Sequence, residues 1–86
     1  MKFPVAIEPG HATQAWGVVV PDLPGCFSAS DIGFDGAIAS AHEAIEMWIE
    51  TTLEMENVIP KPSDLSQLQK LKKFKGWKWV MVEFKP

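Results

Sequence analysis

The sequence contains no arginine and a single cysteine, Cys26. Arginine supplies the planar, bidentate donors that recognise phosphate groups and guanine, so its absence argues against direct reading of nucleic acid. One cysteine excludes an internal disulfide framework and fits a reducing compartment. The first ten residues lack the uninterrupted apolar stretch of a signal peptide, and no run approaches membrane-spanning length. We therefore expect a cytoplasmic protein that does not enter the membrane.

Apolar side chains are plentiful: 47% of the 86 residues are hydrophobic, with four tryptophans and five phenylalanines among them. This supply is ample for one core, so residues 1–86 are predicted to form a single domain. Charge is divided unevenly along the chain. Residues 1–60 carry one lysine and nine carboxylates, whereas residues 61–86 carry seven lysines and two carboxylates. Because opposite potentials steer encounter, the acidic part suits a basic protein partner.

Three stretches near the N-terminus have the pattern of short β-strands. They cover residues 3–8, 16–20 and 26–30, and in the first of them apolar side chains alternate along the chain. Pro4 cannot donate to a ladder, so we expect it at a strand start or a sheet edge. The corner Pro-Asp-Leu-Pro-Gly, residues 21–25, separates the second and third strands. Its prolines and glycine predict a tightly specified turn within an antiparallel meander.

From about Phe34 the apolar spacing changes to three and four residues, which predicts an amphipathic helix of about twenty residues ending near Asn57. A second, very short helix is expected after Ser63, a reasonable N-cap. The predicted apolar stripe comprises Ala37, Ile38, Ala41, Ala44, Ile45, Trp48, Ile49, Thr52 and Leu53. The opposite face is acidic and includes Glu43, Glu46 and Glu50.

The tail, from residue 76 onward, returns to strand character. Both of its faces become apolar in the middle, so the strand is predicted either to lie centrally in the sheet or to be covered by another chain. Candidates for self-association are Trp77, Trp79, Val80 and Val82. The complete pattern predicts an α+β fold of order β-β-β-α-β, with one main helix packed on one face of an antiparallel sheet.

Two patterns suggest chemistry on nucleic acid. In some topologies Glu8, Glu43 or Glu46, and Glu83 could converge as a metal cluster for phosphodiester hydrolysis. Glutamate is usually a solvated surface residue, and the two helical glutamates fall away from the apolar stripe, which argues against convergence. Neither the two isolated histidines nor Cys26, whose strand position is typical of a small buried hydrophobe, indicates a site. We therefore predict no catalytic residue, metal or cofactor.

The second pattern is a run of five lysines interleaved with Phe74, Trp77 and Trp79 over residues 70–79. Such interleaving can bind single-stranded nucleic acid by stacking. Alternatively, the tryptophans belong to a core or an interface, and the lysines guard a strand against edge-to-edge aggregation. The missing arginines favour this second interpretation.

The chain resembles the HicB-like antitoxin family over essentially its whole length. Four segments carry the resemblance in the family's order: VPDLPGCFSASD, AIASAHEAIEMWIE, IPKPSDL and GWKWVMVE. The resemblance implies a partial ribonuclease-H-like fold without nuclease activity. It also implies binding to a HicA-type toxin, a small basic protein that cleaves mRNA, and coverage of the toxin's active surface. At the start of the main helix, residues 30–36 depart from the family's usual Gly-Asp-Thr pattern.

Full-length family members commonly continue into a DNA-binding module that dimerises and represses their own operon. This chain stops at Pro86, just after the last strand, so we expect no such module and no direct nucleic-acid contact. On this interpretation it is a non-enzymatic module that neutralises a toxin and forms a homodimer or higher homo-oligomer. The candidates for the toxin-facing surface are Asp22, Leu23, Phe27, Glu43, Glu46 and Glu50, the first two displayed at the tip of the corner.

Overall fold

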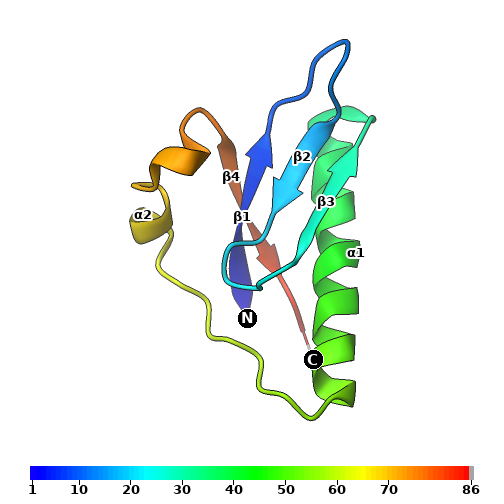
Figure 1. Cartoon of the computed structure of the whole chain (residues 1–86), viewed down its shortest axis with the longest axis vertical. Helices are drawn as coiled ribbons and strands as arrows, with labels where there is room; N and C mark the ends of the chain where they lie inside the picture. Colours follow the sequence, from blue (N-terminus) through cyan, green and yellow to red (C-terminus); the bar gives the residue numbers. More distant parts are fainter. Residues whose placement is uncertain (86) are drawn as a thin grey trace.

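The computed structural model describes residues 1–85; Pro86, where the predicted domain ends, lies outside the described residues. The elements are β1 (Lys2–Glu8), β2 (Trp16–Val19), β3 (Phe27–Ser30), α1 (Gly33–Glu54), α2 (Leu65–Leu68), the short 3-10 helix η1 (Lys72–Phe74) and β4 (Lys78–Glu83). The four strands form one antiparallel sheet of order β3-β2-β1-β4. α1 lies on one side of this sheet, and the segment that carries α2 and η1 returns along the other (Figure 1). The predicted α+β architecture is confirmed.

The core lies between the sheet and α1, and the central strand β1 is buried on both faces. Phe3, Val5 and Ile7 belong to the cluster packed against α1, and none of their surface is exposed. Pro4 and Ala6 point the other way and are also buried. From α1 the cluster receives Ala37, Ala41, Ile45 and Ile49. These four residues follow the predicted stripe, so the spacing identified the face of the helix that packs on the sheet.

Pro4 sits inside β1 without breaking the ladder. Met1 and Phe84 exchange backbone hydrogen bonds of 3.0 and 2.7 Å, and bonding alternates along an antiparallel pair. The pair of Pro4 with Met81 is therefore not hydrogen-bonded, and the missing N–H points toward β2. The pairing between β1 and β2 starts only at Ala6, so nothing is lost there. Pro4 thus lies near the start of β1, at a position where the β2 side of the strand is a sheet edge, in agreement with the expectation.

β4 is an edge strand, so the prediction that it lies centrally in the sheet is wrong. Its neighbour in the sheet is β1 alone among the described residues. Val82 is only 2% exposed and packs toward α1. On the opposite face, Trp77 and Trp79 make edge-to-face contacts with Phe74, at centroid distances of 5.1 and 5.3 Å. Segments of this chain therefore pack on both faces of β4, although Met81 on the outer face stays 46% exposed.

The helix ends differ from expectation in two places. The short helix α2 is capped by Asp64, whose side chain accepts from the backbone N–H of Ser66, so the prediction of Ser63 as N-cap is wrong. At the start of α1 no side chain caps the first turn; instead the Ser30 hydroxyl accepts from the backbone N–H of Ile32 at 3.1 Å. No helix within residues 1–85 has the length and apolarity needed to cross a bilayer.

Candidate partner-binding surface

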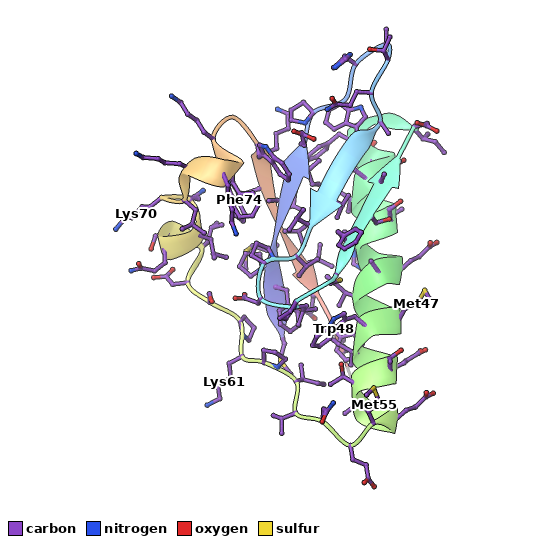
Figure 2. The ribbon with its side chains drawn as sticks, in the orientation of Figure 1. Met47, Trp48, Met55, Lys61, Lys70 and Phe74 are labelled. Carbon is purple, nitrogen blue, oxygen red and sulfur yellow. The ribbon has the colours of Figure 1, made fainter. Side chains whose placement is uncertain are left out.

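An open groove of about 530 Å³ lies between α1 and β3, the edge strand opposite β4. Three large apolar side chains line it and are mostly exposed: Phe27 at 71%, Met47 at 69% and Met55 at 66%. Trp48 also lines the groove; it is half-buried and turned toward the sheet, whereas Met47 points to solvent (Figure 2). Exposed apolar side chains gathered in one groove are typical of an interaction site. We call the surface formed by these four residues the β3–α1 groove.

The predicted acidic residues of α1 separate onto two sides of the helix. Glu43 lines the β3–α1 groove beside Phe27. Glu46 and Glu50 line a second groove, of about 470 Å³, on the side of α1 that faces β4. Glu83 borders this second groove as well. The structure therefore joins Phe27 and Glu43 in one surface and places the other two acidic candidates elsewhere.

The corner of residues 21–25 holds the fold together and does not display Leu23. The prediction that the Leu23 side chain is presented to a partner is wrong, because it is completely buried in the core. Its backbone closes the turn, donating to the Val20 carbonyl at 3.0 Å and accepting from the Cys26 N–H at 2.9 Å. Gly25 has a φ of +81°, the left-handed conformation that glycine adopts without strain. The predicted tight specification of this turn is thus explained by packing.

Two hydrogen bonds join the corner to distant parts of the chain. The Trp48 indole N–H donates to the Pro24 carbonyl at 2.8 Å, which ties the corner to α1. The Asp22 carboxylate accepts from the backbone N–H of Ser63 at 2.8 Å and also from the Ser63 hydroxyl. Asp22 therefore anchors the segment that follows α1. Its two oxygens are engaged within the chain, so we leave it out of the partner-binding surface.

The four carboxylates of the nuclease alternative do not converge. Glu83 pairs with Lys2 at the beginning of β1, whereas Glu8 is the last residue of that strand. Six residues of extended chain separate these two positions by about 20 Å. Glu8 accepts from the Gln14 amide and Glu83 forms an ion pair with Lys85 at 3.6 Å. Within residues 1–85 no three His, Cys, Asp or Glu side chains are grouped to hold a metal ion.

The tryptophans of the basic segment are used inside the fold. Phe74 is 7% exposed and contacts both Trp77 and Trp79, so these rings are not arranged as a free stacking platform. The interpretation of this segment as part of the core is the better one. Cys26 is likewise buried, with 4% of its surface exposed, and this burial raises the pKa of its thiol to about 11. A thiol held neutral in this way is a packing residue, as predicted, although Cys26 lies just before the first residue of β3 and not inside it.

Comparison with known proteins assigns the chain to a family. The family model described as the HicB_like antitoxin of bacterial toxin-antitoxin system matches residues 3–86. The chain belongs to the HicB-like antitoxin family. One relative is the "Uncharacterized 14.9 kDa protein in rep-hol intergenic region" of Haemophilus phage HP1 (strain HP1c1), 35% identical over 83 residues. That match covers 96% of this chain and 60% of the relative's length.

Solved structures of HicB proteins have the same fold. The N-terminal domain of Burkholderia pseudomallei antitoxin HicB superposes with a TM-score of 0.82 at 32% identity, with both chains fully covered. The crystal structure of B. pseudomallei HicB gives 0.86 at 30% identity, covering 98% of this chain and 63% of the other. A chain of a HicA3 and HicB3 toxin-antitoxin complex gives 0.80 at 26% identity, again with full coverage of both.

Sequence reasoning missed three residues of the groove in this HicB-like protein: Met47, Met55 and Trp48, which was assigned to the apolar stripe alone. The signal that could have found Met47 is its position: it follows Glu46 on the outer side of the predicted helix, where an apolar side chain has no core to enter. Met55 lies just beyond the last residue of α1, where a periodic pattern gives no information. Its proximity to Phe27 depends on the packing of α1 against β3.

Proposed function

We propose that this HicB-like chain neutralises a HicA-type, mRNA-cleaving toxin by covering the toxin's active surface with the β3–α1 groove. The observation that carries the proposal is the exposure of Phe27, Met47 and Met55 in one groove of a family member. A similar chain has been solved within a HicA3–HicB3 complex, which supports a toxin of this kind as the partner.

Neutralisation by coverage requires no catalytic group. It requires a rigid surface with a few apolar anchors, which dominate the binding energy, and a charge that attracts the partner. The groove offers Phe27 and Met47 as anchors and Glu43 beside them. A basic toxin would bury the methionines and meet the acidic side of α1. The protein is therefore proposed to act without enzymatic activity and without a cofactor, in the cytoplasm, where mRNA is available.

Met47→Glu tests the assignment of this groove. The substitution places a charge among the apolar side chains, and we expect loss of growth rescue when the variant is co-expressed with the HicA-type toxin of the same operon. Leu53→Glu is the matched control: Leu53 is 54% exposed on α1 but does not line the groove. This control should rescue growth and co-elute with the toxin on gel filtration, as the wild-type chain should.

The outcomes separate the location of the surface from the function itself. If Met47→Glu and Leu53→Glu both neutralise the toxin, the function stands and the groove is wrongly assigned. If the wild-type chain neither rescues growth nor forms a complex, the proposed function is wrong. Thermal unfolding of both variants should match that of the wild type, because solvent-exposed positions seldom contribute more than about 0.5 kcal/mol.

Self-association as a homodimer or higher homo-oligomer is a second part of the proposal, supported by the position of β4 at an edge of the sheet. Repression of the operon is proposed for a longer family protein through its DNA-binding module. No contact with operator DNA is proposed for residues 1–85.

A further inference from the structure

The outer edge of β4 presents backbone groups that have no partner among residues 1–85. Met1 and Phe84 form a hydrogen-bonded pair, so the alternation along the ladder makes Val82 and Val80 bond to β1. The N–H and C=O groups of the residues that alternate with them along β4 point away from the sheet. These residues are Trp79, Met81 and Glu83. An unpaired edge of this kind is a template for another strand.

The two edges of the sheet differ in how far the chain covers them. At β3, the Ala29 carbonyl accepts from the Ser40 hydroxyl of α1 at 3.4 Å, and the helix packs mainly against β3 and β2. At β4, no comparable side chain from the described residues reaches the outward backbone groups. The edge formed by the C-terminal strand is therefore the one whose outward backbone groups receive no side chain from residues 1–85.

We propose that a second copy of this chain pairs with β4 in antiparallel orientation, across a two-fold axis at Met81. A two-fold interface brings the same surface of each copy together, so a residue and its partner exchange roles across the axis. Met81 then lies opposite Met81 of the second copy, and Trp79 lies opposite the partner's Glu83. The two sheets become one continuous sheet, in which every outward group of the three residues has a partner.

The alternation of the ladder selects this register. Outward residues must oppose outward residues, which permits an axis at Met81 or at Val80 but not between them. With the axis at Val80, Glu83 would lie opposite Trp77, which is outside the strand. An axis at Met81 uses all of the outward groups. It also places Val80 opposite the partner's Val82 on the α1 side of the sheet.

Charge complementarity supports the same arrangement. Lys78 shares a face with Val80 and Val82, and its side chain is exposed. In the proposed register Lys78 lies opposite the partner's Phe84, which lines the second groove together with Glu46 and Glu50. Each copy thus brings a lysine to the acidic groove of the other, where His42 and Lys85 also lie. Opposite charges at both ends of the interface favour this register.

This inference deepens the proposed self-association and does not require the toxin. The β3–α1 groove and the β4 edge lie at opposite edges of the sheet. A dimer through β4 therefore leaves the β3–α1 groove of each copy open, and the expected complex contains two antitoxin chains and two toxin chains.

The test measures the molar mass of the purified chain by sedimentation velocity. The wild type should have twice the chain mass of 9.6 kDa. Met81→Lys should weaken the dimer by about tenfold or more, because it sets two like charges directly opposite each other. Leu71→Lys adds the same charge at a 40%-exposed position outside β4 and should remain dimeric. A monomeric wild type, or equal dimerisation of both variants, would overturn the proposal.

Two further measurements report on the register. Hydrogen exchange at the amides of Trp79, Met81 and Glu83 should be slowed in the wild type and fast in Met81→Lys. Lys78→Glu should weaken the dimer, and adding Glu46→Lys should restore it. Fast exchange in a dimeric wild type, or no restoration by the charge swap, would show that the copies associate elsewhere. Met81→Lys should still rescue growth, so failure of this proposal is distinguishable from failure of toxin neutralisation.

Discussion

Asp22→Ala distinguishes a structural role of the Pro-Asp-Leu-Pro-Gly corner from a role in partner contact. The carboxylate holds both the backbone N–H and the hydroxyl of Ser63, 41 residues further along the chain. Hydrogen bonds to a charged group contribute about 1.5–3 kcal/mol each, and less when water competes for them. Asp22 is half-buried and Ser63 is exposed, so we expect a total loss of about 2 kcal/mol. For a domain of this size that corresponds to a decrease in Tm of about 8–16 °C.

A double-mutant cycle with Ser63→Ala isolates the contact. Ser63→Ala removes only the hydroxyl bond and should cost about 1 kcal/mol. The double variant should cost little more than Asp22→Ala alone, since the hydroxyl bond is already absent, which gives a coupling energy of about 1 kcal/mol. Urea unfolding followed by tryptophan fluorescence measures all four proteins. Asp22→Asn, which keeps one acceptor oxygen, should lie between the wild type and the alanine variant.

Two results would refute the hypothesis that Asp22 has a structural role. The first is strict additivity of the two substitutions, because residues without a shared contact do not couple. The second is a variant that is as stable as the wild type but no longer neutralises the toxin. In that case Asp22 would belong to the partner-binding surface after all.

Two further predictions concern Trp48 and Cys26. Trp48→Phe removes the indole donor to the Pro24 carbonyl. It should lower the free energy of unfolding by about 1 kcal/mol more than Trp77→Phe, which is the control for the loss of ring area. Equal losses in the two variants would contradict a stabilising hydrogen bond. Burial raises the pKa of the Cys26 thiol to about 11, from an ordinary 9.0. The folded state therefore favours the neutral thiol, and the stability that this preference contributes is fully present below pH 9 and is lost as the pH rises to about 11. Cys26→Ala should reduce this alkaline loss in urea unfolding, and an unchanged pH profile would show that the thiol is not its source.

Local patterns predicted the elements of this protein well. Alternation in residues 3–8 and the spacing of three and four after Phe34 identified β1, α1 and the faces that they bury. These features are readable because the period of a strand or a helix dictates which side chains share a face. The pattern also predicted the order β-β-β-α-β, and the resemblance to HicB-like antitoxins, now confirmed, agrees with it.

The predictions failed where they depended on which segment of the chain packs on an apolar surface. The two apolar faces of β4 were predicted correctly, but the chain itself covers them, with α1 on one side and Phe74 on the other. Leu23 looked like the tip of an exposed corner, yet the corner folds inward and buries it. In both cases the sequence reports that a side chain is apolar and does not report which segment packs on it.

The sequence by itself determined the class of the fold, the helical face of the core and the stiffness of the corner, because these depend on neighbouring residues. Only the tertiary structure decided that β4 pairs with β1 at an edge, that Asp22 meets Ser63, and that Phe27, Met47 and Met55 share one groove. Such contacts join residues far apart in the chain. They follow from the path of the backbone and the way α1 packs on the sheet, neither of which a local pattern contains.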